Sequence, residues 1–410
     1  MTAVYLYDDA RARRFEPFAL TRPVSELRAG AALIRERWAV ALGARVEGSV
    51  VAAHLVDFTE AGAPPALRGA VPVGAILANS RFAPMLATVA GPAGAAGAAE
   101  TAVWMNGGRV AAVRTAREVP AAVLADGGAA LETLVPRDAA TVEIAGRWLD
   151  EVWQLITTLV ATLREDIDLV GPTLSGISVE HATVIGPHAV YVERGATIEP
   201  LVVFDVSAGP VLVRAGATVR AFTRLVGPCA IGAGARILGD RVHGCSIGEG
   251  SVVRGEISES IVIGHANKGH DGFVGHSVLG RWVNLGAGTI TSNLKNTYGT
   301  VSLWTPEGER DSGALKLGTF FGDHVRTGIG TRFSTGSVIG AGSNVYGSAM
   351  PPRHVPPFSW GDGSALVEYR LEEFLRTAER AMTRRDVAFG DAVRRHLTTA
   401  HARARRGTPR

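Results

Sequence analysis

Three histidines and a lysine are concentrated in one polar segment, residues 264–277. The segment contains His265, Lys268, His270 and His276. An imidazole titrates near neutral pH, so it can take a proton from an attacking amine and release it again. Neutral imidazoles are also good zinc ligands, and the three histidines could form a zinc triad. General base catalysis and metal binding are therefore both open on these residues.

Lysine is confined to the same part of the chain. Of the 42 basic residues only three are lysines, Lys268, Lys295 and Lys316. An ammonium group is more compact, more strongly hydrated and more easily deprotonated than a guanidinium. This distribution indicates either coding bias or a local need for ammonium groups, and the residue types alone leave both open.

A repeat of six residues surrounds this segment. Aliphatic side chains recur in phase at Val213, Val219, Leu225, Ile231 and Ile237. An α-helix does not bring every sixth residue to one face, whereas a three-sided coil with six residues on each side does. The aliphatic side chain then points inward, and glycine or another small residue allows the tight corner. The pattern predicts a left-handed parallel β-helix over residues 171–350, and its polar interruptions at 265–273 and 293–316 become loops.

The repeat is flanked by two regions of other patterns. Residues 1–165 alternate strand-like and helical apolar runs, which predicts an α/β layer domain. We expect strands at 4–7 and 74–79, helices at 27–40 and 148–163, and a loop at 89–102. Glycine is absent from 151–170 and frequent afterwards, which predicts a domain boundary near 165–171.

Beyond residue 351 the pattern becomes helical. An amphipathic stripe from Leu366 to Ala378 and a second apolar pattern at 387–402 predict helices that cap the end of the β-helix. The basic run from Arg403 to Arg410 is expected to be a solvated tail.

The composition excludes several classes of protein. The chain is 46% hydrophobic and 20% charged, with a net charge of only +3, and this gives no indication of a nucleic-acid partner. No apolar run reaches about 18 residues, so no membrane span is expected. The first residues lack a basic and then apolar leader, so we expect a cytoplasmic location. Cys229 and Cys245 are too few for a disulfide framework and are expected to be small wall residues.

The motifs resemble a known enzyme family. The order Lys268-x-His270, then Asn284-x-Gly-Ala-Gly-Thr-Ile-Thr, then Asn293 is similar to the acetyltransferase half of GlmU-type enzymes. Those enzymes combine glucosamine-1-phosphate N-acetyltransferase and UDP-N-acetylglucosamine pyrophosphorylase in one chain. The longer string from Asn267 to Tyr298 looks like a divergent branch with a shorter N-terminal half. The Asn-Leu-Gly-Ala-Gly-Thr continuation does not suit the zinc-binding β-helix carbonic anhydrases.

The resemblance implies a role for each motif residue. His270 would be the general base for the sugar amine that attacks acetyl-CoA, while Asn284 and Asn293 would orient the sugar and the amine. Candidates for the sugar phosphate are Lys268, Lys295 and Arg236. The acetyl-CoA arm would lie along Gly286, Ala287, Gly288, Thr327 and Ala341. The chain departs from the family at Ser258, where a lysine is usual, and at Phe273, where a tyrosine is usual.

The first region resembles the sugar nucleotidyltransferases more weakly. Residues 16–28 are similar to their Pro-Leu-Thr…Arg-Pro-Lys turn, so Arg22 and Arg28 would neutralise nucleotide phosphates. Asn79 lies in the segment 78–82, where that fold often has a metal-binding aspartate.

Several features that nucleotidyl transfer uses are absent from the first region. The expected lysine is Val24, an expected aspartate is Gln154, and no glycine-rich phosphate loop follows the first strand. Nucleotidyl transfer needs Mg²⁺ on carboxylates, for which Asp8 and Asp9, and also Asp150, are the candidates. We therefore expect weak or no pyrophosphorylase activity with UTP.

Together these patterns predict an acetyl-CoA-dependent N-acetyltransferase acting on glucosamine-1-phosphate in UDP-N-acetylglucosamine synthesis. Uridylyl transfer by the first domain would be coupled to it if that domain is active. We expect a homotrimer, because hexapeptide acyltransferases typically place CoA between subunits. The alternatives are a sugar-1-phosphate nucleotidyltransferase with the β-helix as trimer scaffold, and a non-catalytic β-helix that binds a sugar nucleotide.

Overall fold

The computed structural model describes residues 2–89, 102–125, 127–135 and 139–407. The chain divides into two compact units. The first comprises Met1–Phe15, Ala19–Val152 and Gly390–Arg403, and the second comprises Glu16–Phe18, Trp153–Phe389 and Ala404–Arg410. The division after Val152 falls near the start of the glycine-free segment, so residues 153–170 belong to the second unit, whereas the glycine content placed the boundary near 165–171.

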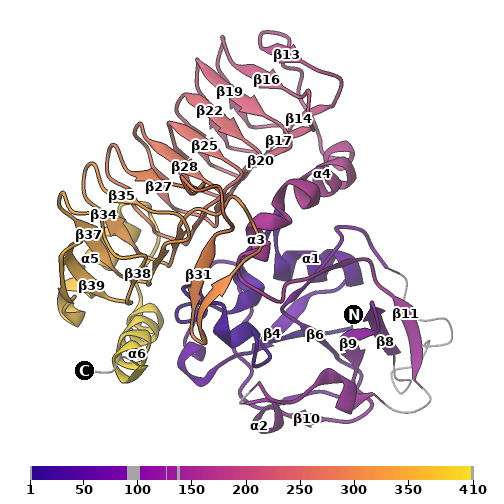
Figure 1. Cartoon of the computed structure of the whole chain (residues 1–410). Coiled ribbons are helices and arrows are strands. Elements are labelled where there is room, and N and C mark those ends of the chain that lie inside the picture. Colours follow the sequence, from indigo (N-terminus) through magenta and orange to yellow (C-terminus); the bar gives the residue numbers. More distant parts are fainter. Residues whose placement is uncertain (1, 90–101, 126, 136–138, 408–410) are drawn as a thin grey trace. The chain divides into compact units, whose positions relative to one another are not determined.

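A six-stranded mixed sheet forms the centre of the first unit (Figure 1), with the order β11-β8-β9-β6-β1-β4. Its strands are β1 (Val4–Tyr7), β4 (Val46–Val50), β6 (Ile76–Asn79), β8 (Ala102–Asn106), β9 (Arg109–Arg114) and β11 (Ala140–Glu143). Strand β1 pairs in parallel with β4 and β6, whereas β9 is antiparallel to both of its neighbours. The predicted α/β domain and its two predicted strands are confirmed.

Short elements complete the first unit. They are β2 (Arg28–Ala29), β3 (Ala32–Leu33), β5 (Ala70–Val71), β7 (Phe82–Pro84), β10 (Val119–Pro120), β12 (Gly146–Trp148), α1 (Ile34–Leu42) and α2 (Ala121–Leu124). The helix predicted over 27–40 begins only at Ile34. Strands β2 and β3 form a hairpin before it, and Gly30 at the turn has a positive φ of 61°, which glycine adopts without steric cost. The loop predicted at 89–102 lies almost wholly outside the described residues.

The second unit begins with helices. The helix predicted over 148–163 is in fact two helices, α3 (Gln154–Thr157) and α4 (Leu159–Val170). The first of them begins later than predicted, because Trp148 still belongs to strand β12. The buried side of α4 carries Leu159, Leu163 and Ile167 at helical spacing.

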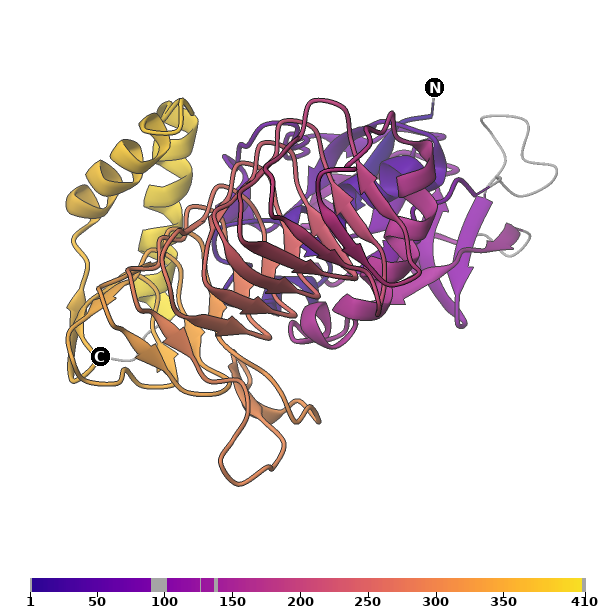
Figure 2. The ribbon, with the colours of Figure 1, turned by 90° about the horizontal axis from the view of Figure 1, so that it is seen from above.

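Three parallel sheets then form a β-helix (Figures 1 and 2), and we number its faces in the order in which the chain visits them. Face 1 contains β13 (Thr183–Ile185), β16 (Val203–Asp205), β19 (Thr223–Val226), β22 (Asp240–His243), β25 (Glu256–Ser258) and β28 (Phe273–Gly275). Face 2 contains β14 (Val190–Val192), β17 (Val211–Val213), β20 (Cys229–Ile231), β23 (Ser246–Ile247), β26 (Ile261–Val262), β29 (Val278–Leu279), β33 (Phe320–Phe321), β36 (Val338–Ile339) and β38 (His354–Val355). Face 3 contains β15 (Thr197–Ile198), β18 (Thr218–Val219), β21 (Arg236–Ile237), β24 (Val252–Val253) and β27 (Asn267–Lys268).

Two faces continue in the later coils. On face 1, β30 (Ile290–Thr291) pairs with β35 (Arg332–Phe333). On face 3, single bridges link Asn267 to Asn284 and Asn284 to Arg326, and the ladder runs on through β34 (Arg326–Thr327), β37 (Asn344–Tyr346) and β39 (Ser359–Asp362).

The hexad side chains occupy the inside of this coil. Val213, Val219 and Leu225 lie on faces 2, 3 and 1 in turn, and Ile231 and Ile237 repeat faces 2 and 3. All five are 0% exposed and belong to one core cluster. The β-helix predicted from the six-residue period is confirmed, and both cysteines are buried free thiols, as expected.

A hairpin interrupts the later coils. Strands β31 (Ser302–Thr305) and β32 (Gly308–Asp311) are antiparallel and form a hairpin that projects from the coil, with β31 labelled in Figure 1. On face 2 Leu279 nevertheless pairs directly with Phe321, so the coil continues across the insertion. The hairpin is joined to β38 by Trp304, whose ring stacks on His354 with centroids 3.6 Å apart.

The C-terminal region combines a strand and two helices: β40 (Ala365–Glu368), α5 (Leu371–Thr383) and α6 (Asp391–Gly407). Leu366 lies in β40, so the predicted amphipathic helix begins later than its apolar stripe. Phe374 of α5 packs edge-on against Phe358, with ring centroids 5.0 Å apart. None of the helices in the described ranges is both long enough and apolar enough to cross a membrane.

Candidate active site on the β-helix and a second pocket in the first unit

The three clustered histidines lie at three different corners of the β-helix. His265 follows β26 at the corner between faces 2 and 3, and His270 follows β27 at the corner between faces 3 and 1. His276 follows β28 at the corner between faces 1 and 2. Within the described residues no group of three or more His, Cys, Asp or Glu side chains could hold a metal ion. The zinc-triad alternative is therefore wrong.

His270 is exposed, and the turn that carries it is fixed by Lys268. The Lys268 ammonium donates to the backbone carbonyl of Arg254, 3.0 Å away, and to that of His270 itself. Lys268 is 1% exposed, and this burial lowers its pKa to about 8. Its ammonium thus has two carbonyl partners and does not face solvent, unlike the phosphate-binding group that the sequence indicated.

In the next coil, the corner of His270 is formed by residues 286–288, two glycines and an alanine, so it exposes mainly backbone. A Cβ on Gly286 would lie 2.6 Å from the carbonyl oxygen of Gly328, so the stacking of coils requires glycine there. Gly288 has a positive φ of 69° and donates its amide to the carbonyl of Asp271 at 3.0 Å. The buried Thr327 accepts the Gly286 amide at 2.9 Å.

The five residues expected along the acetyl-CoA arm do not all lie together. Gly286, Ala287, Gly288 and Thr327 share the corner of His270. Ala341 lies instead between β36 and β37, at the corner between faces 2 and 3, and has no exposed surface. Ala341 therefore does not lie beside the other four, contrary to what the resemblance implied.

Asn293 takes part in a polar chain at the corner between faces 1 and 2. Its Nδ2 lies 2.9 Å from Nδ1 of His276, and Nε2 of His276 lies 3.4 Å from a carboxylate oxygen of Glu259. The hydrogen bond with His276 lowers the pKa of Glu259. A Cβ on Gly275 would lie 2.6 Å from Asn293 Nδ2 and 2.5 Å from the Phe273 ring, so this glycine lets the amide and the ring meet.

Asn284 lies on face 3, away from Asn293. Its Oδ1 accepts a hydrogen bond from Asn267 Nδ2 at 2.9 Å, and Arg326 is its next neighbour on the ladder. These three residues line a pocket of about 200 Å³. The other lining residues are His265, Trp282, Val283, Ala381, Arg384 and Arg385.

The remaining cations expected to bind phosphate have separate surroundings. Lys295 donates to the carbonyl of Thr300 at 2.5 Å, within the loop that leads into the hairpin. Arg236 is exposed on face 3; burial lowers the pKa of Arg385, and the charge of Arg236 lowers it further. Sequence reasoning missed Arg326, Arg384 and Arg385, because neither a motif nor the hexad period marks them.

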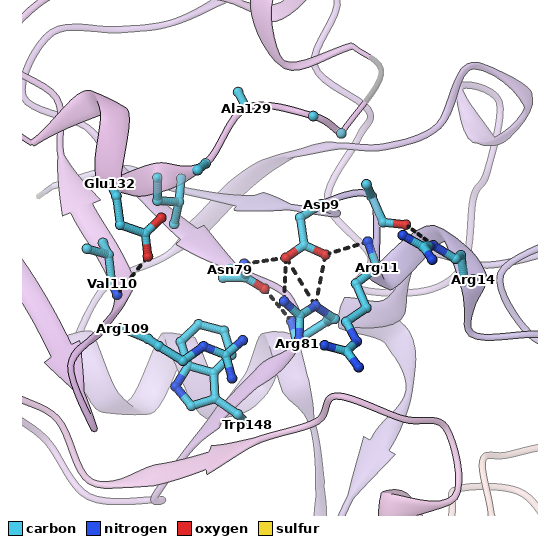
Figure 3. Close-up of a pocket in the computed structure, with 15 residues that line it drawn as sticks. Asp9, Arg11, Arg14, Asn79, Arg81, Arg109, Val110, Ala129, Glu132 and Trp148 are labelled. Carbon is cyan, nitrogen blue, oxygen red and sulfur yellow. Dashed lines mark hydrogen bonds and ion pairs between the residues drawn. The ribbon is translucent and has the colours of Figure 1, made fainter. Parts of the chain in front are cut away.

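The first unit contains a pocket of about 350 Å³ centred on Asp9 (Figure 3). Arg81 holds both oxygens of this carboxylate, with Nε 2.8 Å and Nη2 2.7 Å from them, and Asn79 donates at 2.9 Å. Arg81 also reaches Asp150 at 2.8 Å, and the guanidinium of Arg109 lies 3.7 Å from the centre of the Trp148 ring. The lining also includes Ala10, Arg11, Arg14, Val110, Glu132 and residues 127–131.

The carboxylates expected to bind Mg²⁺ do not fit it. Asp9 accepts the backbone amides of Arg11 and Ala12 as well as Arg81 and Asn79. Burial disfavours its charge, but the hydrogen bonds and charge of Arg81, together with the hydrogen bonds from Asn79 and Ala12, outweigh burial and lower its pKa. Asp8 is buried and accepts the Val24 amide, and burial raises its pKa to about 6. The expected metal site at Asp8 and Asp9 is replaced by an arginine–carboxylate network.

Two of the three residues expected to bind a nucleotide lie away from this pocket. Arg22 is buried in an ion pair with Glu60 at 2.9 Å, and Arg28 is buried with its guanidinium on the carbonyl of Ala31. Only Asn79 lines the pocket. The signal that could have identified the site is Arg81 itself, which stands in the segment where an aspartate was expected.

Comparison with known proteins finds similarity to transferases. Residues 4–172 match the sugar nucleotidyl transferase family. The resemblance drawn from the motifs is confirmed by a bifunctional sugar-1-phosphate nucleotidylyltransferase/acetyltransferase of Sulfurisphaera tokodaii, which is 38% identical over 24% of this chain and 25% of its own. The bifunctional protein GlmU of Methanocaldococcus jannaschii is 31% identical over 24% of each chain. The chain thus spans about a quarter of the length of these relatives.

Two solved structures are also similar. One is a UDP-N-acetylglucosamine acyltransferase of Arabidopsis, 13% identical, with a TM-score of 0.24 over 51% of this chain and 82% of that one. The other is AntD, an N-acyltransferase from Bacillus cereus in complex with dTDP and 3-hydroxybutyryl-CoA, 12% identical, with a TM-score of 0.21 over 52% and 99%.

Proposed function

We propose that the β-helix transfers an acetyl group from acetyl-CoA to the amine of glucosamine-1-phosphate. The observation that carries the proposal is the exposed imidazole of His270, held on a fixed turn beside a corner made largely of backbone. The similarity to a bifunctional sugar-1-phosphate nucleotidylyltransferase/acetyltransferase supports it.

In the proposed reaction the neutral amine of the sugar attacks the thioester carbonyl, and His270 accepts the one proton that its nitrogen loses as the amide forms. A C–N bond forms and the C–S bond breaks, so the leaving thiolate takes a proton and departs as CoA. An exposed imidazole suits this because it can return its proton to solvent or to the thiolate between turnovers. Because residues 286–288 are two glycines and an alanine, the extended CoA arm would lie close to their backbone without obstruction by large side chains.

The same arrangement supports a site completed by a second copy of the chain. Asn284 lies on face 3, whereas Asn293 lies at the corner between faces 1 and 2, so one coil directs them to different sides. The corner of His270 also carries three exposed apolar side chains, Leu201, Phe222 and Ile329, at 61–82% exposure. Apolar side chains aligned on one edge are typical of an interaction surface. We therefore propose a homotrimer in which neighbouring copies share each site.

Acetyl transfer can be tested by following free thiol with acetyl-CoA and glucosamine-1-phosphate. We expect His270→Ala to lower turnover by at least about a hundredfold, the usual scale of a lost general base. The matched control is His188→Ala, which removes another exposed histidine of the β-helix. Near-normal turnover in His270→Ala would exclude this base, and no thiol release by the wild type would exclude the activity.

A further inference from the structure

Three arginines converge on the pocket that contains Asn284. Arg326 is presented by β34, while Arg384 and Arg385 directly follow the end of α5. The lining of this pocket, about 200 Å³ in volume, includes no carboxylate among the described residues. Two amides, Asn267 and Asn284, provide its other hydrogen-bonding groups together with His265.

The positive charge of this pocket is not balanced within the described part of the chain. The polar partner of Arg385 is the carbonyl of Gly250 at 2.7 Å, which carries no charge. Arg326 and Arg384 form no ion pair with any described residue. Burial lowers the pKa of Arg326, and the neighbouring charge of Arg384 lowers it further. Grouped cations without a counter-charge cost free energy, and a bound anion would remove that cost.

The chemistry of the lining favours phosphate over other anions. Guanidinium groups form paired, charge-assisted hydrogen bonds that match the oxygens of a phosphate group. Trp282 closes one side by stacking on His265, with ring centroids 4.6 Å apart and planes 13° apart. The pocket therefore offers a wall of flat rings and a set of convergent donors, as a phosphorylated small molecule needs.

We propose that Arg326, Arg384 and Arg385 bind a phosphate group of the ligand. This rests on the proposed function, in which two ligands carry phosphate: the amino-sugar phosphate and coenzyme A.

Titration calorimetry on the full chain tests the site directly, with inorganic phosphate, glucosamine-1-phosphate and coenzyme A as separate probes. We expect Arg326→Ala and Arg384→Ala each to raise the Kd of the bound phosphate ligand about tenfold or more, the scale of one charge-assisted hydrogen bond. Arg376→Ala is the matched control, because it removes an exposed arginine of α5 whose partner is Glu373 at 2.5 Å. Arg326→Lys keeps the charge and is expected to be weaker than wild type, because it loses the paired donors.

The probes separate the two sources of phosphate. Weaker binding of glucosamine-1-phosphate with unchanged coenzyme A assigns the pocket to the sugar phosphate, and the reverse assigns it to the coenzyme. Unchanged binding of all three probes overturns the proposal. If the arginine variants then also change the mass measured by light scattering, the arginines pair with a second copy of the chain instead. If the wild type binds a phosphate probe but shows no acetyl transfer, and Arg326→Ala loses that binding, the proposed function is refuted and the phosphate site still stands.

Discussion

Lys268 lies two residues from His270, yet its ammonium points toward backbone carbonyls. A buried ammonium loses its hydration, and the two carbonyls compensate for that loss. The motif identified Lys268 as a cation close to the reacting groups. Its burial directs the ammonium to backbone carbonyls instead. We infer that it positions the turn of His270 and does not itself bind the sugar phosphate.

We expect Lys268→Met to lower kcat for acetyl transfer about ten- to a hundredfold, because a misplaced general base acts inefficiently. The KM for glucosamine-1-phosphate should change little, since the ammonium does not bind it. Steady-state kinetics separate the two effects, with the exposed Lys316→Met as the matched control. A raised KM with an unchanged kcat would instead return Lys268 to phosphate binding.

In the first unit, the contacts of Arg81 likewise change the role expected for the nearby carboxylates. It occupies both oxygens of Asp9 and one of Asp150, so neither carboxylate is left open to Mg²⁺. We expect little or no Mg²⁺-dependent release of pyrophosphate from UTP and N-acetylglucosamine-1-phosphate, because nucleotidyl transfer relies on a carboxylate-held metal. A coupled pyrophosphate assay with and without EDTA measures this.

Strong release of pyrophosphate that EDTA removes would contradict this expectation. Loss of that activity in Asp9→Asn would then place the metal at Asp9 in another arrangement of Arg81. If Asp9→Asn had no effect, the nucleotidyl site would lie outside this pocket.

Among the elements, those with a local period were predictable. The β-helix was, because every inward side chain follows the same six-residue rule, as Val213 and Val219 illustrate. The start of α1 was not predictable, because the β2–β3 hairpin before it depends on a turn at Gly30 within an apolar stretch. The arginine pocket was not predictable from the sequence either. Its residues Asn284, Arg326 and Arg384 come from three distant segments that only the folded coil and α5 bring together.

The anchor of the β31–β32 hairpin should depend on pH. Burial lowers the pKa of His354 from 6.5 to about 4, and its neutral ring stacks on Trp304. Because the folded pKa lies below the unfolded one, this group contributes stability that is complete above pH 6.5 and is lost as the pH falls toward about 4. We expect the Tm to decrease over that interval.

The variant His354→Phe retains a ring for stacking and removes the titration. Its Tm should therefore decrease less than that of the wild type between pH 6.5 and 4, as measured by circular dichroism at each pH. A residual slope is expected from His54, whose pKa burial also lowers to about 4. Parallel curves for variant and wild type would show that His354 does not control the transition.

At the scale of the whole molecule, the two asparagines of the motif lie on different sides of one chain, although the proposed reaction uses both. The motif that joins Asn284 to Asn293 is continuous in sequence, but one turn of the coil places them on face 3 and at the corner between faces 1 and 2. Sequence spacing therefore identified the residues without revealing that one chain separates them. A second copy packed along the exposed apolar corner of Leu201, Phe222 and Ile329 would resolve this separation.

Mixed trimers test whether sites are shared between copies. We expect Asn284→Ala and Asn293→Ala each to be nearly inactive alone, and a refolded equal mixture to recover about a quarter of the wild-type activity. In a ring of head-to-tail copies, random mixing gives that fraction of interfaces with both asparagines intact. Free-thiol release measures the recovery, and co-purification of the untagged variant with an affinity-tagged copy of the other shows whether subunits have exchanged. No recovery, with subunit exchange demonstrated, would mean that each copy works alone, and an active monomer in light scattering would lead to the same conclusion.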